Sequence, residues 1–193
     1  MSDDSSRTGK TFPFRGIPTT ADGAAIVVWV DSNITQGACT YPITSSTTMG
    51  GGYQQEVANG KRNLWGETLA FIEPESEHSA ASTCEGFAVA GGRVTNFTSG
   101  QGLVLMKEVL YTISGKRLPV VFHIGVRALT SHSLNVHAGH DDVLAVADCG
   151  WGDRVRQERP ERRRSGADCP TRRRGFGHSF PERARRFFDD PHD

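Results

Sequence analysis

The clearest alternation of apolar and polar positions lies between residues 94 and 126. Val94–Phe97 is a short run of strand type, and Ser99–Gly102 predicts a turn. Apolar side chains then recur at steps of three and four, the spacing of one helix face. They are Leu103, Met106, Val109, Leu110 and Ile113. Gly115, with the basic pair that follows it, predicts a helix end, and the β-branched run 120–126 predicts a second strand. A strand, turn, helix and strand form a βαβ unit, which implies a parallel sheet.

The chain before this unit alternates between helical and strand patterns in the same way. Helices are expected at Ala24–Thr35, at Met49–Gly60 with an interruption at its three glycines, and at Ser79–Ala90; strands are expected at Ala38–Tyr41 and Leu69–Ile72. A last short helix, Val143–Ala147, would be capped by Asp141 and Asp142. These elements predict an α/β, Rossmann-like parallel sheet with helices on both faces.

Two candidate binding positions follow from this fold class. Ligands of open α/β sheets bind beyond the carboxyl ends of the strands. One such end is Thr98–Gly102, where the N–H groups of a helix start could receive an anion. The other is Arg127, immediately after the second strand, whose guanidinium offers two parallel donors to a carboxylate. The alternative for Arg127 is a surface arginine at a strand end.

Two further polar positions allow a structural or a functional interpretation. Five hydroxyl residues, 44–48, follow the strand that ends near Tyr41; they are either a helix N-cap cluster or ligand contacts. Glu77 stands at the start of a helix rich in small residues, where the helix dipole favours a carboxylate. From these residues alone, a solvated capping acid and a binding carboxylate both remain open for Glu77.

Charge divides the chain into two unlike parts. Residues 153–193 hold 12 of the 22 basic residues, all arginine, and 8 of the 22 acidic ones, so the zero net charge averages a basic tail and an acidic body. Arginine runs such as Arg162–Arg164 and Arg172–Arg174 are typical of nucleic-acid arms. A nucleic-acid-binding module is therefore one alternative for this chain, although we consider nucleic acid a poor candidate partner because of the resemblance described below.

Cysteine and histidine spacing gives little support for a metal site. None of the four cysteines has C-x-x-C spacing, and Cys39 and Cys84 are expected to be buried free thiols. His137-x-x-His140, with His132 nearby, is a possible ligand spacing, but we predict no metal there. The first residues lack an apolar signal region, and the longest apolar run is too short to span a bilayer, so a cytoplasmic protein without a membrane partner is expected.

Several blocks occur in an order that resembles a known family. FTSGQGLVLM, LPVVFHIGVRAL and GHDDV, preceded by YPITSST and SEHSA, are similar to the first domain of pyruvate:ferredoxin or flavodoxin oxidoreductase. The resemblance covers about Asp22–Gly152. It implies a thiamine-diphosphate-binding fold, incomplete at its C-terminal end, and a part in the oxidative decarboxylation of a 2-oxoacid such as pyruvate to an acyl-CoA.

The resemblance also implies roles for three residues. Glu77 matches the glutamate that hydrogen-bonds the aminopyrimidine ring of thiamine diphosphate. Thr44, in the YPIT block, matches a threonine that contacts the 2-oxoacid, and Arg127 matches the arginine that binds the substrate carboxylate. The intact enzyme is expected to be a homodimer that also uses Mg²⁺, iron–sulfur clusters, CoA and a ferredoxin or flavodoxin acceptor.

The expected domain organisation is a flexible lead-in (1–20), a partial pyrimidine-binding domain (21–152) and a tail (153–193). The resemblance stops at Gly152, and the arginine-rich tail is expected to be disordered or the product of a frameshift, which sequencing of the gene would decide. No stretch resembles a diphosphate-binding motif and no cysteine set could hold an iron–sulfur cluster. The isolated chain is therefore expected to be inactive, and a non-catalytic partner domain is a further alternative.

Overall fold

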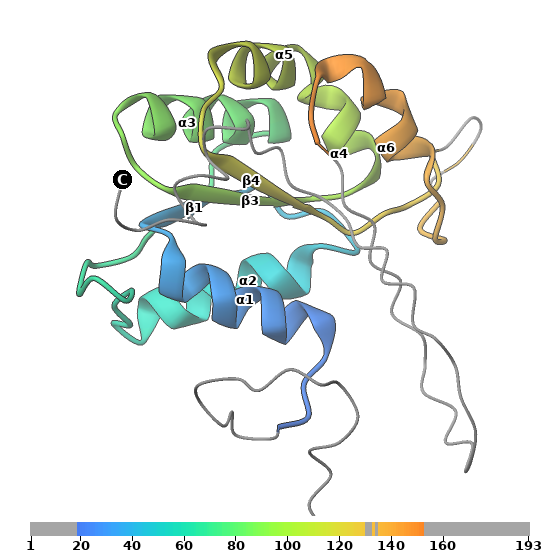
Figure 1. The fold of residues 1–193 in the computed structure, drawn as a ribbon. Helices are drawn as coiled ribbons and strands as arrows, with labels where there is room; N and C mark the ends of the chain where they lie inside the picture. Colours follow the sequence, from blue (N-terminus) through green and yellow to red (C-terminus); the bar gives the residue numbers. More distant parts are fainter. Residues whose placement is uncertain (1–18, 130–132, 134, 153–193) are drawn as a thin grey trace, which may run out of the picture.

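A computed structural model describes residues 19–129, 133 and 135–152 of the chain. Its centre is a four-stranded parallel sheet of β1 (Gly37–Cys39), β2 (Ala70–Ile72), β3 (Val94–Thr98) and β4 (Val120–Ile124), in the order β2-β1-β3-β4 (Figure 1). The predicted strands are confirmed with small shifts at their ends. The lead-in up to residue 18, the tail and His132 lie outside the described residues.

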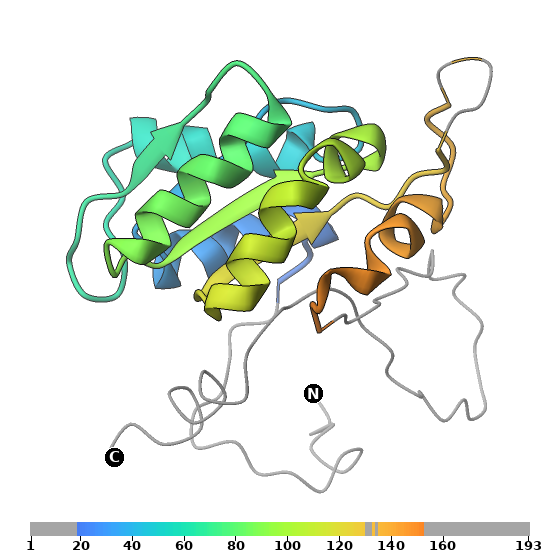
Figure 2. The same cartoon turned by 90° about the horizontal axis from the view of Figure 1, so that it is seen from above.

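Helices cover both faces of the sheet, which confirms the predicted α/β class (Figures 1 and 2). One face carries α1 (Gly23–Ile34) and α2 (Thr47–Ala58). The other carries α3 (Glu77–Val89), α4 (Gly100–Leu105), α5 (Lys107–Lys116) and α6 (Asp141–Ala145), followed by a 3-10 turn at Ala147–Cys149. No helix in the part of the chain that the structure describes is long and apolar enough to cross a membrane.

Each face of the sheet has its own apolar core. The five apolar positions of the helical pattern at 103–113 are all buried in the core under α3–α6, as that pattern predicts. The core under α1 and α2 is smaller and is built around Tyr53 and Phe97. Cys39 and Cys84 are fully buried free thiols, as expected, and burial raises the pKa of the Cys84 thiol well above its ordinary value.

The predicted interruption of the helix near residue 50 is wrong. Helix α2 runs without a break through its three glycines. A methyl group on Gly52 would lie 2.9 Å from Cγ2 of Val28 in α1, and one on Gly50 would lie 3.4 Å from Cγ2 of Thr40. The glycines therefore let α2 pack closely against α1 and the sheet, and this packing outweighs their low helix propensity.

The predicted single helix after the glycine turn is in fact two helices. The turn residues Gly100–Gly102 are already helical, and the chain changes direction at Met106, between α4 and α5. Leu103 and Ile113, on opposite sides of the break, lie in the same core. Helix α5 ends where predicted, and Arg117 adopts the left-handed conformation (φ 57°) that closes it.

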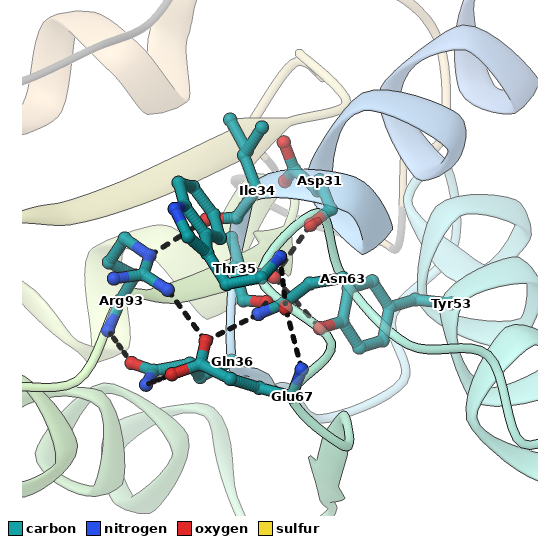
Figure 3. A network of polar contacts seen from close by, with 9 residues as sticks. Asp31, Ile34, Thr35, Gln36, Tyr53, Asn63, Glu67 and Arg93 are labelled. Carbon is teal, nitrogen blue, oxygen red and sulfur yellow. Dashed lines mark hydrogen bonds and ion pairs between the residues drawn. The ribbon is translucent and has the colours of Figure 1, made fainter.

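A polar network lies at the amino ends of three strands (Figure 3). The predicted site lies at the opposite, carboxyl ends of the strands. Glu67, just before β2, accepts hydrogen bonds from Gln36 (2.7 Å), Asn63 (2.6 Å) and Arg93 (2.7 Å), and Arg93 also donates to the Ile34 carbonyl. Gln36 precedes β1 and Arg93 precedes β3. Side chains from distant parts of the sequence therefore hold these strand starts in register.

Candidate functional site

The strand order creates a switch point at the carboxyl ends of β1 and β3. From β1 the chain passes through α2 to β2 on one side, and from β2 it returns through α3 to β3 on the other side of β1. The helices of these two connections lie on opposite faces of the sheet (Figure 1). Ligands of such sheets bind in the crevice where the connections diverge. The loop containing Thr44 and the start of α4 flank this point.

Arg127 lies three residues beyond β4 and is only 3% exposed. Its Nη1 donates to the Thr44 carbonyl (3.2 Å) and its Nη2 to Oε1 of Gln101 (2.6 Å). Its Nε has no hydrogen-bond partner, and no carboxylate among the described residues forms an ion pair with the guanidinium. The alternative interpretation of Arg127 as a surface arginine is therefore wrong. A buried cation held by neutral oxygens retains its affinity for an anion.

Two glycines allow the strand ends to come this close. Gly100 has a positive φ of 51°, and a methyl group on it would lie 2.4 Å from Nε of Arg127. A methyl group on Gly125 would lie 2.6 Å from the carbonyl oxygen of Ser45, whose own φ is 88°. The guanidinium therefore lies directly on the backbone at the start of α4, a position that a side chain at residue 100 would obstruct.

Asp142 joins the three segments around Arg127. Its carboxylate is fully buried and accepts hydrogen bonds from the backbone N–H groups of Gly100 (2.9 Å), Arg127 (3.0 Å) and Val143 (2.8 Å). The predicted helix at 143–147 begins earlier, at residue 141, and His140 occupies the N-cap position, so the prediction that Asp141 and Asp142 cap it is wrong. Asp142 instead stabilises a tertiary junction between the end of β4 and the start of α4.

Glu77 is the first residue of α3, as predicted, but Ser76 is the residue that caps the helix, through a bond from the Ser79 N–H to its hydroxyl (3.2 Å). The Glu77 side chain lies against α4. A methyl group on Gly102 would lie 2.7 Å from its Cγ and 2.8 Å from its Oε1. Gly102 therefore leaves the space that this carboxylate occupies, and Glu77 is partly buried rather than fully solvated.

Thr44 reaches the site through its backbone. Its carbonyl accepts the bond from Arg127, while its side chain is exposed. Of the five hydroxyl residues in this loop, Ser46 occupies the N-cap position of α2, but its hydroxyl donates to the Ile43 carbonyl (3.0 Å) and makes no cap bond. A residue of the hydroxyl cluster therefore occupies the N-cap position, but it makes no capping hydrogen bond. Thr44 itself lies beside the guanidinium.

The structure therefore brings the three predicted residues to one short segment, the first turn of α4. Arg127 packs on Gly100 and binds Gln101, Thr44 binds Arg127, and Glu77 packs on Gly102. No side-chain role for Gln101 follows from the sequence, which predicts Asp142 to be a helix cap; the structure places them inside α4 and α6. Within the described ranges no group of three or more His, Cys, Asp or Glu side chains could hold a metal ion.

These features define the class of protein: a parallel α/β domain with a buried arginine, bonded to neutral oxygens, and a partly buried glutamate at its switch point. The family model described as "Pyruvate flavodoxin/ferredoxin oxidoreductase, thiamine diP-bdg" matches residues 33–153. The chain belongs to this family, as the ordered blocks predict.

Individual relatives agree with the family match. The chain is 42% identical over 131 residues to the pyruvate-flavodoxin oxidoreductase of Klebsiella pneumoniae and 39% identical over 132 residues to the pyruvate:ferredoxin oxidoreductase of Moorella thermoacetica. Each alignment covers 68% of this chain but 11% of the relative. A solved structure of 2-oxoglutarate:ferredoxin oxidoreductase from Magnetococcus marinus, with 2-oxoglutarate, coenzyme A and succinyl-CoA bound, is 23% identical, with a TM-score of 0.47 over 58% of this chain and 18% of that chain.

Proposed function

We propose that this domain supplies the pyrimidine side of a thiamine diphosphate site and the carboxylate-binding part of the pocket for a 2-oxoacid such as pyruvate. The observation that carries the proposal is the buried Arg127 guanidinium, held by two neutral oxygens at the switch point of a parallel sheet. Burying a charge without a carboxylate partner costs free energy, so this arginine does not contribute to stability through an ion pair. Binding of an anion would account for its position.

The residues around Glu77 fit the cofactor. The space left by Gly102 lets a carboxylate lie at the first turn of α3 beside the start of α4, on the same segment that holds Arg127. A carboxylate there can accept a hydrogen bond from a protonated ring nitrogen and favour the charged form of the ring. When bound, thiamine diphosphate supplies the electron sink for decarboxylation of a 2-oxoacid.

Arg127 and Thr44 would orient the substrate. The two Nη atoms of a guanidinium match a planar carboxylate, and fixing that group holds the neighbouring ketone carbon in one position. Thr44 lies in the loop after β1, beside the guanidinium, so its exposed side chain can add a single contact to the bound acid. In this scheme the chain's own residues bind and orient, and they carry no electron.

The remaining components belong to the rest of the enzyme. The aligned segment spans about a tenth of the length of the relatives it matches. We propose that the longer protein carries the diphosphate and Mg²⁺ site, the iron–sulfur clusters, the CoA site and the contacts with ferredoxin or flavodoxin. We also propose that it works as a homodimer.

The test is a chimera in which residues 22–152 replace the aligned segment of the Klebsiella pneumoniae relative. The readout is pyruvate-dependent reduction of a viologen dye. Glu77→Gln should lower kcat by at least about 100-fold, the usual loss when an acid–base group is removed. Arg127→Lys should raise KM for pyruvate by about 10-fold, because a bidentate contact becomes a point contact. Thr44→Val should raise KM less, because it removes a single contact.

A matched control is Glu73→Gln, which removes an exposed carboxylate four residues away and should leave turnover unchanged. Glu77→Gln turning over at the parental rate would refute the role of Glu77. The isolated chain should reduce no dye, with or without added thiamine diphosphate and magnesium.

A further inference from the structure

Gln101 occupies the position where a buried arginine usually meets a carboxylate. Its Oε1 lies 2.6 Å from Nη2 of Arg127, the shortest of the hydrogen bonds that this guanidinium makes. Glutamate has the same shape and length as glutamine, so a carboxylate would fit there. The chain has an amide instead, which orients the guanidinium without neutralising it.

Neither of the two nearby carboxylates, those of Asp142 and Glu77, forms an ion pair with the guanidinium of Arg127. Asp142 uses its carboxylate on three backbone N–H groups, including the backbone N–H of Arg127 and not its side chain. Glu77 lies against Gly102, on the other side of the first turn of α4. The one side-chain acceptor in contact with the guanidinium among the described residues is therefore the neutral amide of Gln101.

Gly100 and Gln101 together fix the direction of the guanidinium. The backbone of Gly100 supports its Nε side, since a methyl group there would overlap it, and Gln101 holds Nη2. Thr44 holds Nη1 through its carbonyl at the longer distance of 3.2 Å. An anion that approaches the switch point meets a donor group whose plane is already set, which lowers the entropy cost of binding.

We propose that Gln101 is a positioning residue for carboxylate recognition: its neutral side-chain oxygen orients Arg127 and keeps the positive charge available to a 2-oxoacid. This inference rests on the proposed function of Arg127. It predicts that Gln101→Glu satisfies the guanidinium internally. A carboxylate at residue 101 then competes with the carboxylate of the ligand for the same donors.

The experiment is a nuclear magnetic resonance titration of the full 193-residue chain at constant ionic strength, with pyruvate and, as a matched ligand control, methyl pyruvate, which has no carboxylate. The backbone amides of Gly100 and Arg127 should shift with pyruvate and not with the ester. Gln101→Glu should weaken pyruvate binding at least about 10-fold, the effect of about 1.4 kcal/mol. The urea midpoint of this variant should not fall below that of the parent, because the new carboxylate pairs with the buried guanidinium.

Gln101→Met separates positioning from charge. It keeps the side-chain volume but removes the acceptor, so rotation of the Arg127 guanidinium, visible as averaging of its Nη proton signals, should become fast. Its pyruvate binding should weaken less than that of Gln101→Glu, because no competing charge is introduced. A merely structural role would instead lower the urea midpoint of both variants together with their binding.

The outcomes separate the two proposals. A parent chain that shows no difference between pyruvate and methyl pyruvate would refute the proposed function of Arg127. A parent chain that binds pyruvate through its carboxylate, with Gln101→Glu binding equally well, would refute the role of Gln101 alone. Unchanged guanidinium rotation in Gln101→Met would also overturn the positioning role.

Discussion

Replacing Asp142 by asparagine tests the junction that holds the site together. The parent carboxylate accepts three backbone hydrogen bonds at 2.8–3.0 Å and is fully buried. Asparagine keeps one oxygen and turns the other acceptor into an N–H₂ donor. In one orientation the donor faces the Val143 N–H, and in the other it faces the N–H groups of both Gly100 and Arg127.

The expected loss of stability follows from these bonds. A hydrogen bond to a charged group contributes about 1.5–3 kcal/mol and a neutral one about 1 kcal/mol, while a buried donor without an acceptor costs about 1–3 kcal/mol. With the two long-range bonds retained in weaker form and the Val143 N–H left without an acceptor, Asp142→Asn should lower the free energy of unfolding by about 2–4 kcal/mol.

The assay is urea unfolding at neutral pH, followed by far-ultraviolet circular dichroism, with the slope of the transition compared between variants. The matched control is Asp141→Asn, the exposed neighbour, whose carboxylate accepts a bond from the Leu129 N–H (3.2 Å). It should change the free energy of unfolding by less than about 0.5 kcal/mol. Equal midpoints for the Asp142→Asn variant and the parent would show that the three bonds do not contribute to stability.

Three further predictions follow from other parts of the structure. Gly51→Ala should stabilise the chain by about 0.5–1 kcal/mol, because no atom lies within 4 Å of the new methyl group in α2. Gly52→Ala should instead destabilise it by about 1–3 kcal/mol, because its methyl group would contact Val28. Equal urea midpoints for the two variants would contradict the close packing of α1 and α2. The hydrogen bond from Tyr111 to Asp148 raises the pKa of Tyr111 from 10.0 to about 12, so Asp148→Asn should return that pKa toward 10.0 in a magnetic resonance titration of the ring; a pKa that stays near 12 would refute this cause. The bonds from Asn63, Gln36 and Arg93 lower the pKa of Glu67. The stability that Glu67 contributes is therefore present above its pKa in the unfolded chain and is lost as the pH falls through its lower pKa in the folded chain. Glu67→Gln should flatten the acid side of a plot of unfolding free energy against pH, and an unchanged plot would contradict the effect of the network.

Local pattern was sufficient to predict most of the fold. The structure agrees with the sequence where the local pattern is strong, as for the strand expected at Val94–Phe97 and the helical positions from Leu103 to Ile113. The errors have a common cause, since tertiary packing overrides local propensity. The glycines of α2 predict an interrupted helix, but in the structure they allow α1 and α2 to pack closely. The spacing of apolar residues around Met106 predicts one continuous helix, but α4 ends there and α5 begins.

The candidate site was predictable only in part. Arg127 follows from its place after a strand, whereas ligand roles for Glu77 and Thr44 follow only from the family pattern; whether the three residues bind ligands is still a prediction. Gln101 and Asp142 were missed because their contacts join residues 26 and 42 positions apart. Such contacts leave no local periodicity. The closeness of Gly100 to Arg127 likewise depends on the strand order, which the pattern of elements alone does not fix.

The strand order has a consequence for synthesis on the ribosome. Strand β1 is made first but pairs with β2 and β3, so both of its edges stay open until later segments emerge. At roughly 5–20 residues per second, about 2–7 s pass between Ala38 and its partner Phe71, and longer before Thr95 arrives on the other side. During that interval α1 and α2 can already pack together through Val28 and Gly52. The helical pair α1 and α2, on the opposite face from α3–α6, would thus be the first part of the domain to form, and the proposed ligand site would be the last.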